Sequence, residues 1–244
     1  MPGAEDNDVF DIARSIKERF REIPLVVLTP FSHGITRRME NEDLSIFEYV
    51  FCWLGNTDLL ISIIKLIEDK MNLEHDVNEA GVQMILLVED SIRFYSSILP
   101  NLYSYILLQS QRFSTEALNR HTATLRMRGR PKVVLARTYE EAMALYDKYS
   151  ANTLGVISDV RFPMHGARDS EAGFRLLEDI RKQDEYVPLI MESSETANKY
   201  RADREHFHFV DKNSKMLSVE LRHLIEEHMG FGDFVFRDPH THKE

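Results

Sequence analysis

From residue 82 onward, short apolar runs alternate along the chain with amphipathic segments. Five runs rich in branched aliphatic residues are typical of buried strands, and in the segment after each run apolar residues recur at helical spacing. Strands that alternate with helices predict a parallel sheet with helices on both faces. We expect strands at 84–88, 132–136, 154–158, 188–191 and 207–210, and helices at 91–125, 139–149, 170–184, 197–206 and 217–228.

The first 76 residues carry a shorter version of this pattern. It predicts a helix at 8–22, strands at 25–29 and 49–53, and a helix at 59–72. The stretch 73–81 is polar and has no apolar period. We interpret residues 73–76 as the end of this unit and residues 77–81 as a linker. A second unit then covers 82–237, and a tail covers 238–244.

The helix predicted at 91–125 is unusually long. As one helix it would extend about 50 Å at ~1.5 Å per residue, more than the sheet it covers. Pro100 is expected to kink or restart it. A projecting stripe of Phe113, Leu118 and Leu125 would form an interaction surface and could support a homodimer. The alternative is a helical hairpin that folds back onto its own domain.

Composition and charge narrow the classes of function. Lys and Arg number 30 and Asp and Glu 40, which leaves a net charge of −10 and argues against nucleic-acid binding. No apolar run approaches the ~20 residues that cross a bilayer, so no membrane association is expected. The acidic residues 1–8 lack the features of a signal peptide, and a cytoplasmic protein is expected. Cys52 is the single cysteine, which excludes an intrachain disulfide.

Polar residues follow the predicted strands of the second unit. Ligands of parallel sheets bind beyond the carboxyl ends of the strands, so these residues should converge on one edge. Taken alone, each is more often a turn former, a helix cap or a solvated lysine; the combination on four strands is what indicates a site. The residues are Glu89, Asp90, Asp159, Ser193 and Lys212.

Three carboxylates at one place repel each other, and a divalent cation relieves that repulsion. Hard oxygen ligands in a partly hydrated site suit Mg²⁺. One carboxylate could then attack phosphorus, while the cation and the lysine neutralise charge on the transferred oxygens.

The segments that carry these residues match a known family. They are Ile85–Ser91, Gly155–Pro163, Pro188–Ser194 and Phe209–Asn213, and with them residues 82–229 resemble the receiver domain of two-component response regulators. The resemblance implies a flavodoxin-like, doubly wound five-stranded α/β fold. It also implies that Asp159 is the phosphoacceptor and Lys212 the phosphate-contacting lysine. Glu89, Asp90, Asp159 and the backbone carbonyl of Arg161 would bind Mg²⁺, and Ser193 and Phe209 would be the switch residues.

Two features depart from the family pattern. Asn213 stands where receivers usually have proline, and the spacing from Asp90 to Asp159 is longer than usual. Residues 9–72 resemble the last part of a second, degenerate receiver, with Thr29 as its switch threonine. That part lacks the expected lysine and an acidic pair, so it is either a fragment or packs on a partner. A weaker resemblance, through Gly230–Phe236, is to tandem-receiver regions of phosphoenolpyruvate-synthase-like proteins.

The resemblance implies a phosphorylation-switched signalling receiver. Its partner would be a histidine kinase or a phosphotransfer protein, and it would not be an enzyme beyond self-phosphorylation and autodephosphorylation. The alternative is a receiver-fold module for interaction or dimerisation that works without phosphate. A haloacid-dehalogenase-like phosphatase is disfavoured, because those enzymes have an aspartate where this chain has Arg161.

Overall fold

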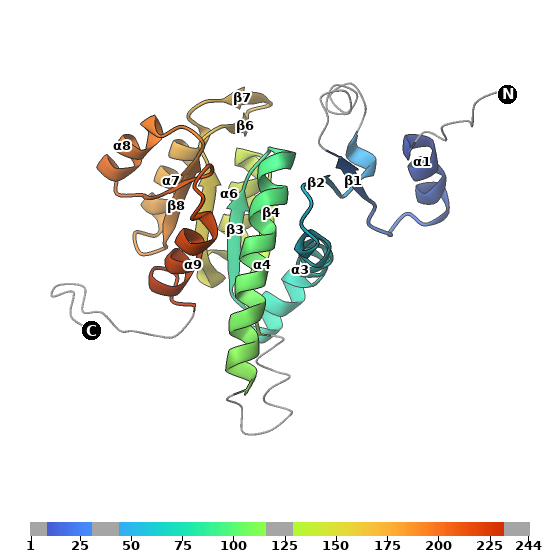
Figure 1. The fold of residues 1–244 in the computed structure, drawn as a ribbon, viewed down its shortest axis with the longest axis horizontal. Coiled ribbons are helices and arrows are strands. Elements are labelled where there is room, and N and C mark those ends of the chain that lie inside the picture. Colours follow the sequence, from blue (N-terminus) through green and yellow to red (C-terminus); the bar gives the residue numbers. More distant parts are fainter. Residues whose placement is uncertain (1–8, 31–43, 116–128, 232–244) are drawn as a thin grey trace.

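The computed structural model describes residues 9–30, 44–115 and 129–231. A parallel sheet of five strands lies at its centre (Figure 1). The spatial order is β4-β3-β5-β8-β9, which is the 2-1-3-4-5 order of flavodoxin-like folds. The predicted parallel α/β sheet is therefore confirmed. Its strands are β3 (Met84–Val88), β4 (Lys132–Ala136), β5 (Thr153–Asp159), β8 (Leu189–Ser193) and β9 (His208–Asp211).

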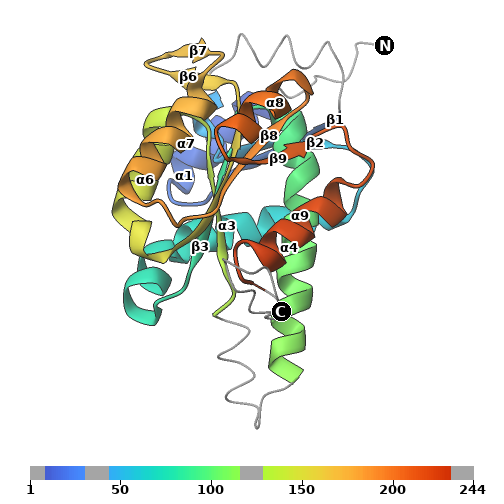
Figure 2. The same cartoon turned by 90° about the vertical axis from the view of Figure 1, so that its left-hand side faces the viewer.

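Helices cover both faces of the sheet (Figure 2). One face packs against α4 (Ile92–Thr115) and α9 (Leu217–Glu227). The other packs against α6 (Tyr139–Tyr149), α7 (Ala172–Gln183) and α8 (Ala197–Arg204). Side chains alternate along a strand, so every residue of β3 is buried in one of the two clusters. This double burial explains the uninterrupted apolar run.

A small antiparallel hairpin, β6 (Phe162–Met164) with β7 (Ala167–Asp169), lies between β5 and α7 and was not predicted. Its turn residues His165 and Gly166 both have positive φ, 54° and 79°, as tight hairpin turns require. Strands of three residues are too short to produce a recognisable alternation.

The linker predicted at 77–81, and the helix end at 72 before it, are wrong. Helix α3 runs without a break from Asp58 to Ala80 and ends at Gly81, whose φ of 63° gives a left-handed cap. Leu59 and Leu66 pack in the cluster of the α4 face, whereas Leu73 and Val77 belong to the cluster of the opposite face. The helix therefore crosses the edge strand β4 and covers it.

The N-terminal elements are α1 (Val9–Arg19), β1 (Val26–Pro30), a short 3-10 helix (Leu44–Ile46) and β2 (Tyr49–Trp53). Strands β1 and β2 pair in parallel, and β2 packs on α4. The backbone amide of Cys52 donates to Ser96 Oγ at 2.9 Å, and the Tyr95 hydroxyl donates to the Val50 carbonyl. This segment thus packs on the second unit; its resemblance to the end of a receiver remains a prediction.

The described part of the long helix, α4, differs from the prediction at Pro100 and at Phe113. α4 continues through Pro100, and at its C-terminal end the Phe113 ring meets the Phe231 ring edge to face at 5.8 Å between centroids. Phe113 therefore has an intramolecular partner and is not part of a free stripe. Leu118 and Leu125 lie outside the described residues. Among the helices of the described ranges, none has the length and apolar character needed to span a bilayer.

Candidate functional site

The predicted acidic residues meet at the carboxyl edge of the sheet. Glu89 and Asp90 follow β3, and Asp159 ends the adjacent strand β5. Carboxylate oxygens of the three residues lie within 4.8 Å of one another. Glu89 is fully buried, and one of its oxygens accepts the backbone amide of Ser91 at 2.9 Å, which fixes its orientation.

Lys212 enters this cluster from the end of β9. Its ammonium lies 2.6 Å from Asp159 Oδ1 and also contacts Glu89 Oε2. It stands 4.4 Å from the centroid of the Phe94 ring, a cation–π contact from α4 that sequence reasoning missed. The side chain is buried, so these contacts replace the water that an ammonium needs.

A fourth carboxyl group, missed by sequence reasoning, belongs to the same cluster. Glu192 pairs with Asp159 in the register of β5 and β8 and is almost fully buried. Its Oε1 lies 3.9 Å from Lys212 Nζ and has no hydrogen-bond partner within the described ranges. Glu192 directly follows an apolar run and precedes the predicted switch serine. This position at the end of the strand was the signal that could have placed it in the cluster.

Burial and mutual repulsion set the protonation of the cluster. Burial raises the pKa of Glu89 well above its usual range against the lowering effect of Lys212, and the nearby charges of Glu192 and Asp159 add to the rise. Burial also raises the pKa of Asp90, against the lowering effect of Arg168. For Lys212, burial acts to lower the pKa, but the surrounding carboxylates outweigh it and raise that pKa.

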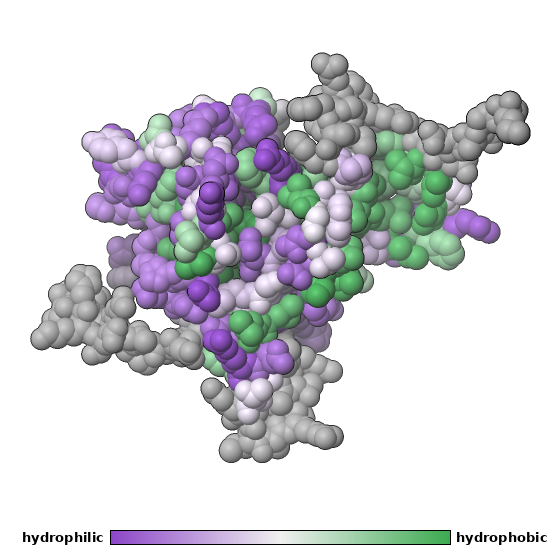
Figure 3. Space-filling model, viewed as in Figure 1, coloured by the Kyte–Doolittle hydropathy of each residue, from purple (hydrophilic) through white to green (hydrophobic). Residues whose placement is uncertain are grey.

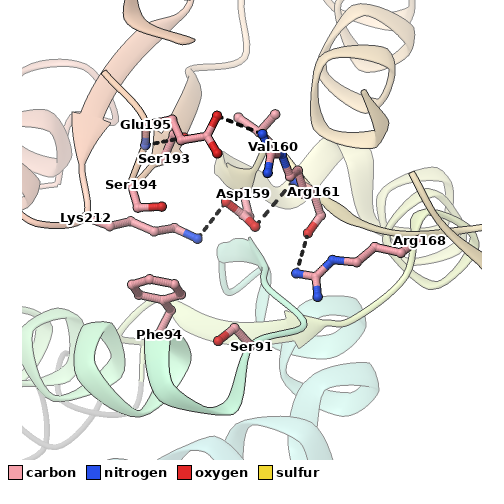
Figure 4. Close-up of a pocket in the computed structure, with 10 residues that line it drawn as sticks. All are labelled: Ser91, Phe94, Asp159, Val160, Arg161, Arg168, Ser193, Ser194, Glu195 and Lys212. Atoms are coloured by element: carbon pink, nitrogen blue, oxygen red, sulfur yellow. Dashed lines mark hydrogen bonds and ion pairs between the residues drawn. The ribbon is translucent and has the colours of Figure 1, made fainter. Parts of the chain in front are cut away.

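Two arginines border the pocket in front of Asp159 (Figure 4). The Arg161 amide faces Asp159 Oδ2 at 3.4 Å, and its guanidinium pairs with Glu195 at 2.7 Å. Its carbonyl, the predicted metal ligand, lies 3.5 Å from a guanidinium nitrogen of Arg168. Arg168 comes from the unpredicted strand β7.

The two predicted switch residues occupy different places. Ser193 lines the pocket of Asp159, and its hydroxyl accepts the amide of Glu195 at 3.1 Å and the side-chain amide of Asn198 at 2.9 Å. Phe209 instead packs against the sheet cluster of α6 to α8 and lines a second hollow, beside α8 and α9.

Gly173 in the first turn of α7 makes the close packing of the site possible. A Cβ at this position would stand 2.0 Å from the backbone carbonyl oxygen of Asp159. Only glycine allows the helix to approach the strand end this closely.

The donor set fits a magnesium ion. Three carboxylates and a backbone carbonyl are hard oxygen ligands, and two of the residues that supply them, Asp159 and Arg161, line the pocket. Three buried or half-buried acidic groups, Glu89, Asp159 and Glu192, share the positive charge of Lys212, and Asp90 pairs with Arg168. A divalent cation would relieve the remaining repulsion.

Comparisons with known proteins give a distant likeness among solved structures. No protein-family model and no curated protein matches the chain. Among solved structures, the chain is similar to a response regulator receiver domain protein from Clostridium thermocellum, at 16% sequence identity and a TM-score of 0.41. The match covers 61% of this chain and 95% of that one. The fold assignment given above rests on the order and direction of the strands in this chain.

Proposed function

We propose that this chain is a signalling receiver that accepts a phosphoryl group on Asp159 from a histidine kinase or a phosphotransfer protein. The observation that supports this best is the contact set of Asp159. Its carboxylate lies within 4.8 Å of oxygens of Glu89 and Asp90, 2.6 Å from Lys212, and borders an open pocket. A cytoplasmic location fits this role.

The chemistry follows from these contacts. An oxygen of Asp159 attacks phosphorus, the bond from phosphorus to the donor nitrogen breaks, and its electron pair leaves with the donor. Glu89, Asp90, Asp159 and the Arg161 carbonyl would hold magnesium, which supplies positive charge to the phosphoryl oxygens when bound. Lys212 neutralises a further oxygen, and the Ser193 hydroxyl can exchange its present partners for a phosphoryl oxygen.

In this proposal the protein is a phosphoacceptor and not a turnover enzyme. The acyl phosphate changes what Ser193 bonds to, and the hollow that Phe209 lines, on the adjacent strand, is the expected place of the readout. A partner that binds one arrangement better than the other would then shift the population between them.

The proposal is tested by incubation with a small phosphodonor such as acetyl phosphate and Mg²⁺, followed by intact-mass measurement. We expect the mass of one added phosphoryl group in the wild type and none in Asp159→Asn. Asp203→Asn, which changes an exposed aspartate on α8, is the matched control and should be phosphorylated like the wild type. A wild type that gains no phosphoryl group, or an Asp159→Asn variant that still gains one, contradicts the proposal.

A second candidate is a phosphate-independent interaction module, which exposed apolar side chains favour. Figure 3 shows apolar surface over α1 and the start of α3, where Leu60, Ile61 and Ile64 are each 46–62% exposed. This function predicts self-association or partner binding that Asp159→Asn leaves intact and Ile64→Asp abolishes. Light scattering on the two variants separates the candidates.

A further inference from the structure

Arg168 reaches two of the oxygens assigned to the cation. One guanidinium nitrogen lies 3.3 Å from Asp90 Oδ1 and 3.5 Å from the Arg161 carbonyl oxygen, and Figure 4 shows the second contact. A cation bound to both oxygens would have to lie between them, about 2.0–2.1 Å from each if it is magnesium. The guanidinium and the ion therefore compete for the same oxygens.

The backbone that carries Arg168 is held in place at the hairpin turn and at the end of β7. The His165 amide donates to Glu140 Oε1 on α6 at 2.8 Å, and Asp169 Oδ1 accepts the Glu171 amide at 2.7 Å. Strand β7 thus carries Arg168 to the acidic cluster on a fixed backbone.

The side chain itself can leave. It is 63% exposed, and its two contacts are longer than the 2.7 Å pair of Arg161 with Glu195 across the pocket. Exposed ion pairs contribute little to stability, so a divalent ion at moderate concentration can displace the guanidinium.

We propose that Arg168 is an internal counter-ion that competes with the divalent cation for Asp90 and the Arg161 carbonyl. It thereby sets the free-cation concentration at which the site becomes ready for phosphoryl transfer. The inference rests on the proposed function, because it concerns the cation that function requires. Arg168 acts through the cation ligands and is therefore a positioning residue.

The test is a titration of the full chain with Mn²⁺ at constant ionic strength, with free Mn²⁺ followed by electron paramagnetic resonance. We expect Arg168→Gln to bind Mn²⁺ about three- to tenfold more tightly than the wild type, as loss of an exposed competing charge allows. Arg168→Lys keeps the charge and should lie between the two. Arg175→Gln removes an exposed guanidinium that pairs with Asp169, and should bind like the wild type.

A double-mutant cycle shows whether the effect passes through Asp90. In an Asp90→Asn background, Arg168→Gln should change the affinity much less. Equal or weaker binding by Arg168→Gln, or an equal gain in Arg175→Gln, overturns the inference and leaves the proposed function standing. Absence of Mn²⁺ binding in the wild type and in every variant overturns the cation assignment and the inference together.

Discussion

The buried carboxyl group of Glu192 lowers the stability of the folded protein as the pH rises. Its carboxyl group is buried beside Asp159 and Glu89, and burial, together with the charge of Asp159, raises its pKa to about 7 against the lowering effect of Lys212. A group whose pKa is higher in the folded than in the unfolded state binds protons more tightly when folded. Stability is then lost as the pH rises from the ordinary carboxyl pKa of 4.5 toward 7.

Glu192→Gln should remove this loss, because glutamine does not titrate. We expect the free energy of unfolding of the wild type to fall between pH 5 and pH 8 by about 1–3 kcal/mol more than that of the variant. Urea denaturation at both pH values in the presence of a chelator measures this difference. Glu185→Gln, at an exposed position before β8, is the control and should keep the wild-type slope. An unchanged slope in Glu192→Gln would show that this carboxyl group does not titrate in the window.

At the scale of elements, a buried ion pair joins α3 to the sheet. Asp69 on α3 is fully buried and accepts two bonds from Arg130, at 2.6 and 3.0 Å. The same carboxylate accepts the Tyr103 hydroxyl of α4 at 2.8 Å and the Val133 amide of β4 at 3.0 Å. A single side chain thus connects three elements at the sheet edge that α3 covers.

Asp69→Asn should strongly destabilise the protein. It removes the charge that compensates Arg130, which is only 4% exposed, and a buried charge without its partner costs about 3–5 kcal/mol. The midpoint of chemical denaturation measures the loss. Glu68→Gln, which changes the neighbouring and more exposed partner of Arg130 at 3.6 Å, should cost less than about 1 kcal/mol. Similar losses in the two variants would mean that burial of Asp69 is not the decisive difference.

Sequence reasoning found the elements in which burial follows a regular pattern, such as strands covered on both faces and helices with one buried stripe. Strand β3 is apolar throughout because both of its faces are covered, and the acids that follow it could be placed at the sheet edge from the strand order alone. The last part of α3, residues 73–80, was missed because only Leu73 and Val77 are buried there. Arg168 could not be placed at the site, because its position depends on a hairpin of two short strands. Glu192 could not be assigned to the site either, because its place there depends on where β8 ends.

At the scale of the whole molecule, these contacts turn two apparent units into one. α3 shares its apolar side chains between the clusters of both sheet faces, and β2 bonds to α4 through Tyr95 and Ser96. Neither set of contacts can be lost without exposing buried surface of the sheet domain. We therefore expect the N-terminal elements and the sheet to unfold together.

The intrinsic fluorescence of the single tryptophan can test whether the two regions unfold together. Trp53, the single tryptophan, ends β2, so its fluorescence reports the N-terminal elements, whereas far-ultraviolet circular dichroism reports all helices and strands. In urea, the two signals should give coincident curves with one midpoint, because α3 and α4 are common to both regions. A Trp53 transition that precedes the loss of helix by a clear interval of urea concentration would mean that β1 and β2 detach as a separate unit. Asp69→Asn adds a second test. If the whole structure unfolds cooperatively, this variant should shift the fluorescence midpoint and the circular dichroism midpoint by the same amount. A shift of only one midpoint would contradict cooperative unfolding.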